Sequence, residues 1–268
     1  QQSAGFKFLH MIGTFGVAIP TLLTGFTVLA SLEGAGRLRG GKGLFGWIAA
    51  LDWKEPMVVA GMLALFMLIA GGWGGMINAS YQMNALVHNT QWVTGHFHLI
   101  FGGTTVIMYL AVAYWIWPKL TGRALASRAM AVWQLWLWTI GMMVLTMPWH
   151  ALGLLGQPRR ISSTPYDSPL VARWDPHELV MIVGGVILMI SSVLFILNLV
   201  LSHRTRKAEA QSNDHWAIAV YPPMHIPKPM NGYALWNGIV AVWMVIAYGI
   251  PIMQLIMLDA PGSLAWGF

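Results

Sequence analysis

Apolar residues in this chain gather into long, nearly continuous runs that are separated by short polar segments. A membrane-spanning helix needs about 20 apolar residues to cross a hydrocarbon core of about 30 Å. The runs are continuous rather than alternating, which favours helices over the strands of a membrane barrel. The pattern predicts an all-α polytopic membrane helix bundle, one membrane domain over residues 1–268, with six spans at about 8–32, 56–77, 92–118, 129–155, 178–202 and 232–258.

The composition agrees with an integral membrane protein. Hydrophobic residues make up 57% of the chain and charged residues 9%, against roughly 25% charged residues in soluble domains. Of the 15 lysine and arginine residues, eleven fall in the loops on one side of the predicted spans and four on the other. By the positive-inside rule the eleven lie in the cytoplasm, which places both chain ends on the outer side. The net charge of +6 then reflects topology and anionic lipid rather than nucleic-acid binding.

Two other kinds of site are disfavoured by the sequence. The chain has no cysteine, so neither disulfides nor thiolate metal ligands are expected. The glycine-rich basic segment 36–46 has some likeness to a phosphate-binding loop, but it lacks the Gly-Lys-Ser/Thr ending and follows no strand. We interpret this segment as a tight connection between two spans.

His96 and His98, in Gly-His-Phe-His-Leu, lie inside the third apolar run. On a helix, side chains two positions apart point about 200° from each other, so the pair does not chelate one ion from one face. The spacing suggests a helix between two large cofactors, with one axial imidazole for each and Phe97 between them. The alternative is a pair of histidines that hydrogen-bond within a polar helix interface.

Two further sets of polar residues accompany this helix. Arg159 and Arg160 lie on the outer side, against the charge trend, and favour a nearby anion such as a carboxylate over simple snorkelling to the interface. Thr21, Thr24 and Thr27 recur at every third position near one face of the first span. Their hydroxyls suit either a proton path or hydrogen bonds to the preceding helical turn, and the residues alone favour the second.

Several motifs resemble subunit I of heme-copper oxidases. They are Asn-Ala-Ser at 78–80, His-Asn-Thr-Gln-Trp-Val-Thr-Gly-His-Phe-His at 88–98, and His-Ala-Leu-Gly-Leu-Leu-Gly-Gln-Pro-Arg-Arg at 150–160. The segment 33–47 is similar to the B-type branch of that family. The resemblance implies that the chain is the second half of the subunit, from its eighth helix onward, and begins just after the copper-ligand histidine pair.

The resemblance assigns roles to the histidines. It implies that His96 binds the iron of the high-spin, oxygen-reducing heme, expected to be of a type, and is the catalytic ligand. It implies that His98 binds the low-spin heme, of b or a type. The copper beside the high-spin heme would take its ligands from outside this chain. We expect His150 to support the hemes rather than to bind them.

The remaining site residues are assigned in the same way. The resemblance implies that Arg159 and Arg160 hold heme propionates and that His88 and Asn89 lie near the propionates of the high-spin heme. Asn84 departs from the family pattern, which has a carboxylic acid there. For the threonine series at 21, 24 and 27, the resemblance shifts the balance towards a proton-input channel from the cytoplasm.

The reaction implied is four-electron reduction of dioxygen to water in a prokaryotic cytoplasmic membrane, coupled to proton uptake. The implied partners are the N-terminal half of subunit I, a subunit II with a dicopper centre, and a cytochrome c-like electron donor. Two alternatives remain open. One is a nitric oxide reductase of the same superfamily, which has non-heme iron in place of copper. The other is a non-catalytic diheme electron-transfer subunit, which would require more intramembrane histidines than we find.

Overall fold

The structure is a computed structural model that describes residues 4–161, 164, 167–205, 227–249, 252–253 and 256. The chain divides into two compact units, Gln1–Ala210 and Gln211–Phe268. Within the described residues all regular elements are helices, and the only strand-like pairing is an isolated bridge between Thr90 and Pro158. This confirms the all-α membrane bundle predicted from the sequence.

The described residues of the first unit form five helices that are long and apolar enough to cross a membrane. The first is made of α1 (Ala4–Gly16) and α2 (Ala18–Leu38), and the third of α6 (Gln91–His98), a π-helical segment η1 (Leu99–Thr105) and α7 (Val106–Thr121). The others are α4 (Pro56–Ala79), α8 (Arg128–Leu154) and α9 (Val171–Ser202). Five of the six predicted spans coincide with these helices, although α9 begins seven residues before the predicted residue 178.

The described residues of the second unit contain part of the predicted sixth span. Here α10 (Tyr233–Met244) continues into a second π-helical segment, η2 (Val245–Gly249). Together they form the apolar helix Tyr233–Gly249, and Ile252, Met253 and Ile256 are helical as well. Most of the predicted span beyond Gly249 lies outside the described residues.

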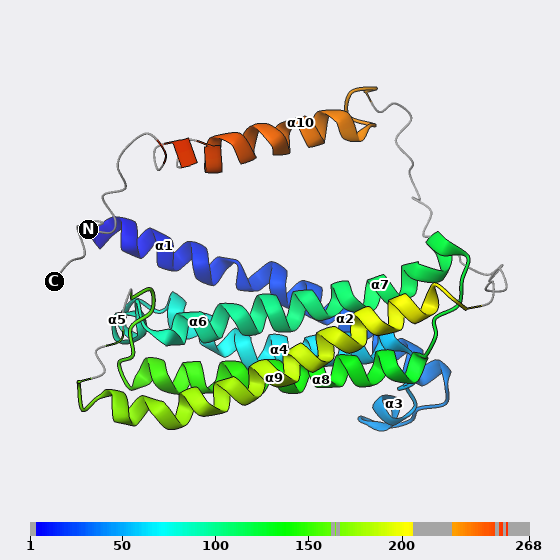
Figure 1. Cartoon of the computed structure of the whole chain (residues 1–268), viewed down its shortest axis with the longest axis horizontal. Helices are drawn as coiled ribbons and strands as arrows, with labels where there is room; N and C mark the ends of the chain where they lie inside the picture. The colour runs from blue at the N-terminus through cyan, green and yellow to red at the C-terminus, as the bar shows by residue number, and fades with distance from the viewer. Residues whose placement is uncertain are drawn as a thin grey trace. The chain divides into compact units, whose positions relative to one another are not determined.

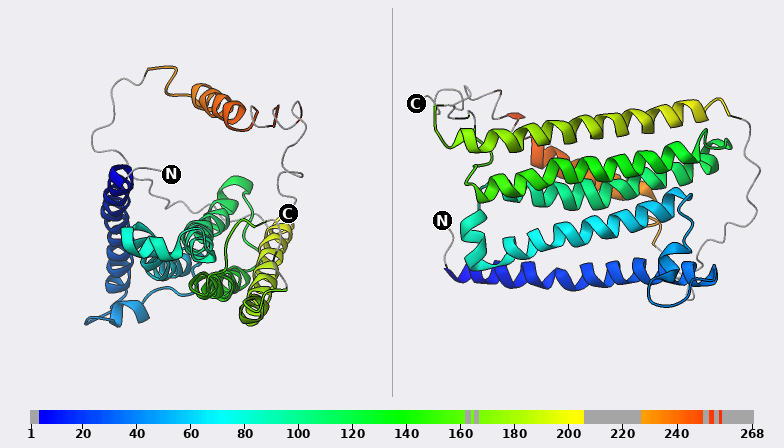
Figure 2. Two further views of the ribbon diagram at one scale, coloured as in Figure 1. Left: turned by 90° about the vertical axis from the view of Figure 1, so that its left-hand side faces the viewer. Right: turned by 90° about the horizontal axis from the view of Figure 1, so that it is seen from below.

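Three of the long helices surround the core of the first unit. Figures 1 and 2 show α1–α2 alongside α4, and α9 alongside α8, in agreement with the contacts between these elements. The core joins α4, the η1–α7 helix and α8 through fully or nearly buried apolar side chains: Val59, Ala60, Leu63, Ala64, Met67, Leu99, Ile107, Ala111, Leu135 and Met142.

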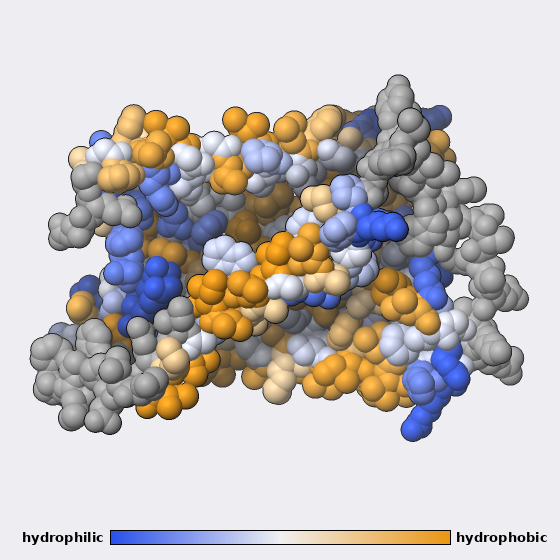
Figure 3. All heavy atoms as spheres, turned by 90° about the horizontal axis from the view of Figure 1, so that it is seen from above, coloured by the Kyte–Doolittle hydropathy of each residue, from blue (hydrophilic) through white to orange (hydrophobic). Residues whose placement is uncertain are grey.

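The outward faces of the helices are apolar as well. Side chains such as Leu22, Phe26 and Ile196 are more than half exposed. In the space-filling view, orange apolar residues cover much of the helical surface and blue hydrophilic residues gather towards the ends (Figure 3). An apolar exterior of this kind is expected where lipid or another membrane segment replaces water.

The glycine-rich segment 36–46 forms a tight connection around Trp47, in the short helix α3 (Gly46–Ala49). A Cβ atom on Gly36 would collide with the carbonyl oxygen of Trp47, and one on Gly41 would lie 2.5 Å from the Trp47 Cα. The glycines therefore permit close packing of the backbone. An ion pair of 3.1 Å between Arg39 and Asp52 closes the same connection.

Candidate functional site

His96 and His98 are directed towards different elements. The Nδ1 atom of His96 lies 2.9 Å from the carbonyl oxygen of Gly71 in α4. The Nδ1 atom of His98 lies 2.8 Å from the carbonyl oxygen of Thr94, one turn earlier in the same helix. The His98 ring packs 4.8 Å from the ring of Trp149 in α8. The two imidazoles therefore serve separate surroundings, as their spacing in the sequence predicts.

Both histidines are held in the tautomer that suits a metal ligand. A backbone carbonyl only accepts hydrogen bonds, so the Nδ1 atom of each ring must carry the proton and donate it. The Nε2 atom of each neutral ring then keeps its lone pair. A hydrogen bond of this kind is the usual way in which proteins orient an imidazole ligand and raise its basicity.

Glycines of α4 make the space that the His96 ring occupies. A Cβ atom on Gly75 would lie 2.9 Å from the Cε1 atom of His96, and one on Gly74 would lie 3.2 Å from its Nδ1 atom. Such approaches are closer than ordinary van der Waals contact. The absence of side chains at these positions allows the imidazole to lie directly against the backbone of α4.

His150 of α8 also packs against this helix, and its Nε2 atom lies near the same Gly74, whose Cβ atom would be 3.3 Å from it. Its Nδ1 atom donates to the carbonyl oxygen of Thr146 at 2.8 Å, and its ring meets that of Trp92 edge-on at 4.8 Å. A Cβ atom on Gly95 would lie 2.7 Å from the Nδ1 atom of His150. The ring of His150 thus fills the space beside Gly95, the residue directly before His96.

A short backbone pairing joins the start of α6 to the loop after α8. The amide of Gln91 donates to the carbonyl of Gln157 at 3.0 Å, and that of Arg159 donates to the carbonyl of Asn89 at 2.9 Å. Asn89 and Arg160 both have φ of 60°. Asparagine tolerates this left-handed conformation, whereas for arginine it costs on the order of 1–2 kcal/mol. The pairing brings His88 and Asn89 next to the two arginines.

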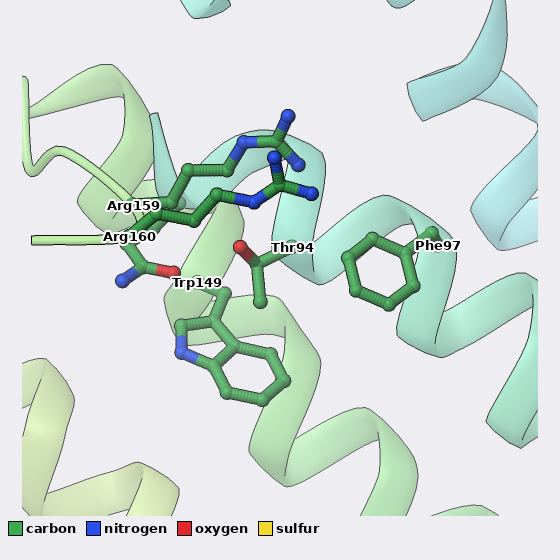
Figure 4. A pocket seen from close by; sticks show the side chains of 6 residues that line it. Thr94, Phe97, Trp149, Arg159 and Arg160 are labelled. Atoms are coloured by element: carbon green, nitrogen blue, oxygen red, sulfur yellow. The ribbon is translucent and has the colours of Figure 1, made fainter. Parts of the chain in front are cut away.

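The arginines border a cavity of about 340 Å³ whose other lining residues are Gln91, Thr94, Phe97 and Trp149. Figure 4 shows the guanidinium groups of Arg159 and Arg160 lying side by side above Thr94, with Trp149 and Phe97 below them. Two adjacent residues of an extended chain would point in opposite directions. The left-handed turn at Arg160 accounts for their common direction.

The electrostatics of this cavity favour an anion. Among the described residues neither arginine forms an ion pair, and the Nε atom of Arg159 is buried with no hydrogen-bond partner. A buried donor without a partner costs about 1–3 kcal/mol, more when it is charged. The arrangement therefore fits a ligand with carboxylate groups at one edge and a flat apolar body against Trp149 and Phe97.

Sequence reasoning missed three participants in this site. Gly71 contributes only its carbonyl oxygen, which leaves no signal in the sequence. Trp149 lines the cavity and contacts His98, and its position directly before His150 in the recognised motif was an available signal. Glu178 lines a neighbouring cavity of about 340 Å³ and accepts a hydrogen bond of 2.6 Å from the side-chain amide of Gln157.

The threonine series lies apart from the histidines. The hydroxyls of Thr21, Thr24 and Thr27 donate to carbonyl oxygens four residues earlier, at 2.9, 3.0 and 2.8 Å. All three residues are exposed on the face of α2 that no described element covers. Each hydroxyl keeps lone pairs that can accept a further hydrogen bond. A proton path along this face remains a prediction.

Comparison with known proteins places these residues in a family. A family model described as cytochrome c and quinol oxidase polypeptide I matches residues 1–187. The chain is 40% identical to a cytochrome c oxidase subunit 1 of Thermus thermophilus, over 97% of this chain and 48% of that protein. It is 31% identical to a cytochrome c oxidase subunit 1 of Thermostichus vulcanus, over 73% of this chain and 32% of that protein.

A similar structure has also been solved. A heme-copper terminal oxidase dimer determined by cryo-EM superimposes with a TM-score of 0.70 and 31% identity, over 77% of this chain and 38% of that one. The chain spans about half the length of the Thermus subunit. The matched stretch includes His96, His98, Arg159 and Arg160. The chain belongs to the cytochrome c and quinol oxidase polypeptide I family, which confirms the resemblance to subunit I of heme-copper oxidases.

Proposed function

We propose that this chain forms the part of the catalytic subunit of a B-type respiratory oxidase that holds two hemes. The complete enzyme reduces dioxygen to water with electrons from a cytochrome c-like donor. The observation that carries this proposal is the placement of His96 and His98, whose Nδ1 atoms are anchored to α4 and α6 so that the two Nε2 atoms serve different sites.

Each residue of the site has a distinct task in this proposal. The Nε2 atom of His96 is the axial ligand of the high-spin heme, and that of His98 is a ligand of the low-spin heme. Arg159 and Arg160 bind heme propionates, since guanidinium groups match carboxylates in two-point geometry. The bound hemes supply the redox chemistry with oxygen and electrons, and the protein sets their orientation and potential.

His88 and Asn89 extend the propionate-binding end of the site, because the pairing with Arg159 holds them beside it. The missing components come from other segments. They are the N-terminal half of subunit I, with the copper ligands and the second ligand of the low-spin heme, and a subunit II with a dicopper centre. Both ends of this chain lie on the outer side of the cytoplasmic membrane.

Proton uptake is assigned to the open face of α2. The hydroxyls at positions 21, 24 and 27 donate to the helix and keep lone pairs that can accept, so water or another segment can complete a proton path from the cytoplasm. Moving each charge across 100 mV is worth about 2.3 kcal/mol, which is how such uptake conserves energy.

The test uses the purified complete complex and two single variants. His98→Ala should remove the low-spin heme band from the reduced-minus-oxidised spectrum and leave a heme that binds carbon monoxide. His96→Ala should remove the carbon monoxide signal. His203→Ala, at the exposed end of α9, is the matched control and should change neither.

The outcomes separate the alternatives. Metal analysis should give copper together with two hemes. Iron in place of copper would assign the complex to nitric oxide reduction. A complex with a single heme would refute the two-site arrangement, as would the loss of the same heme in both histidine variants. Two hemes without carbon monoxide binding would favour an electron-transfer subunit.

A further inference from the structure

The histidine-bearing helix changes its geometry directly after His98. The seven residues of η1 form π-turns, and the amide of Val106 donates to the carbonyl of Phe101, five residues earlier. The segments on both sides, α6 and α7, are ordinary α-helix. π-Turns are rare, and they are found frequently at functional sites. This one needs a reason and a source of stability.

The reason lies in the spacing of the buried residues. From Gly95 to Ala111 they recur at every fourth position, at Gly95, Leu99, Gly103, Ile107 and Ala111, and Tyr114 follows after three. In an α-helix each step of four residues turns about 40° too far, so four steps would wind the buried stripe about 160° around the helix.

The π-turns correct this drift. With about 4.4 residues per turn, each step of four falls short by about 33°. The two steps from Leu99 to Ile107 therefore offset most of the excess rotation of the two α-helical steps, one before them and one after them. The stripe stays on one face, against α4 and α8. The segment α7 packs in the core. The π-turns between α6 and α7 therefore determine in which directions His96 and His98 point.

Trp138 of α8 supplies the stabilising contact. Its indole Nε1 donates to the carbonyl oxygen of Gly102, in the middle of η1, at 2.8 Å. Where the π-turns return to α-turns, the hydrogen bonds change from a spacing of five residues to four, so the carbonyl after Phe101, that of Gly102, is left without a backbone donor. The neighbouring α8 residue Met142 lies so close that a Cβ atom on Gly102 would be 2.8 Å from its Cε atom. The hydrogen bond from Trp138 to Gly102, called the clasp below, thus holds the segment against α8 at one point.

We propose that Trp138 is a positioning residue for the two histidines. Its indole N–H holds the π-turns in place, and the π-turns fix the rotation of α6 about its axis. The clasp itself is a property of this chain, whereas its effect on bound hemes rests on the proposed function. No catalytic contact is assigned to Trp138, which acts only through the backbone.

The test compares three changes in the complete complex. Trp138→Phe keeps an aromatic ring and removes the donor. Replacement of Trp138 by benzothienylalanine keeps the shape of the indole and also removes the donor, so it covers the case in which the phenylalanine variant folds poorly. Trp133→Phe, on the same helix with 66% of the residue exposed, is the control.

Two measurements are made on each. Amide hydrogen exchange across residues 99–107 should quicken roughly tenfold when the donor is lost, the effect of one hydrogen bond. The iron–imidazole stretching band of the high-spin heme, read by resonance Raman spectroscopy, should shift or broaden, as should the low-spin heme band. Trp133→Phe should leave exchange and spectra as in the wild type.

Each result decides something. Unchanged exchange in both donor-free forms would overturn the clasp. Faster exchange with unchanged spectra of both hemes would overturn the positioning role. If the wild-type complex holds no heme, the proposed function fails, and the exchange comparison still decides whether Trp138 stabilises the π-turns.

Discussion

Gly75→Ala tests whether the backbone of α4 seats the His96 ring. The added methyl group would lie 2.9 Å from the Cε1 atom of His96 and 3.4 Å from its Nε2 atom. Carbon atoms settle at about 3.5 Å or more, so the ring must move by about 0.6 Å. The hydrogen bond from His96 to Gly71, now 2.9 Å, would then leave the normal range. Overpacking of this kind costs about 1–3 kcal/mol.

The variant should lose high-spin heme selectively. We expect a lower ratio of carbon monoxide-binding heme to low-spin heme in the purified complex, and a shifted iron–imidazole band in what remains. Gly72→Ala is the control, because Gly72 lies on the same helix and a Cβ atom there would meet nothing within 4 Å. If both alanine variants bind carbon monoxide alike, or if Gly75→Ala depletes the low-spin heme instead, the placement of His96 against α4 is wrong.

Three further predictions address other parts of the site. Arg159→Ala should lower the midpoint potential of the heme at His98 by some tens of millivolts, since a nearby cation favours the reduced form by about 1–2 kcal/mol, and Arg159→Lys should restore most of it in a redox titration. Thr24→Val should slow oxygen consumption and proton uptake without changing the heme spectrum, while Thr14→Val, which removes a similar hydrogen bond of 2.8 Å in α1, should not; equal turnover in both would exclude Thr24 from a proton path. Gln134→Leu should lower thermal stability in detergent by about 1–2 kcal/mol, because the buried Gln134 amide donates to Ser191 of α9 at 2.9 Å, and an unchanged melting temperature would show that the contact contributes nothing.

The sequence predicted the elements better than their limits. Hydropathy located the five long spans, because a continuous apolar run in a membrane satisfies its backbone hydrogen bonds by forming a helix. It placed the start of α9 at residue 178, since the preceding turns carry Arg173, Asp175 and His177 and lower the average. These residues are nevertheless helical. The π-turns of η1 were missed, although the four-residue spacing from Gly95 to Ala111 was present, because such a stripe is recognisable only once burial is known.

The site was predictable as far as it rests on side-chain direction. The spacing of His96 and His98 required two separate surroundings, and the structure provides them. The unusual charge of Arg159 and Arg160 indicated an anion, and both line one cavity. The partners of the histidines were not predictable, because Gly71 and Thr94 act through carbonyl oxygens that every residue has. The left-handed turn at Arg160 has no sequence signal either, since arginine seldom adopts it.

The dependence on backbone atoms explains how the histidines keep their direction. The His96 ring lies against Gly74 and Gly75 of α4, and the carbonyl oxygen of Gly71 accepts its hydrogen bond. A Cβ atom on Gly153 of α8 would collide with the amide nitrogen of Trp92. At these points the His96 ring and the start of α6 lie directly against neighbouring backbone. Because backbone moves less readily than side chains, the two histidines are preorganised by the packing of α4, α6 and α8 rather than by the hemes they are proposed to bind.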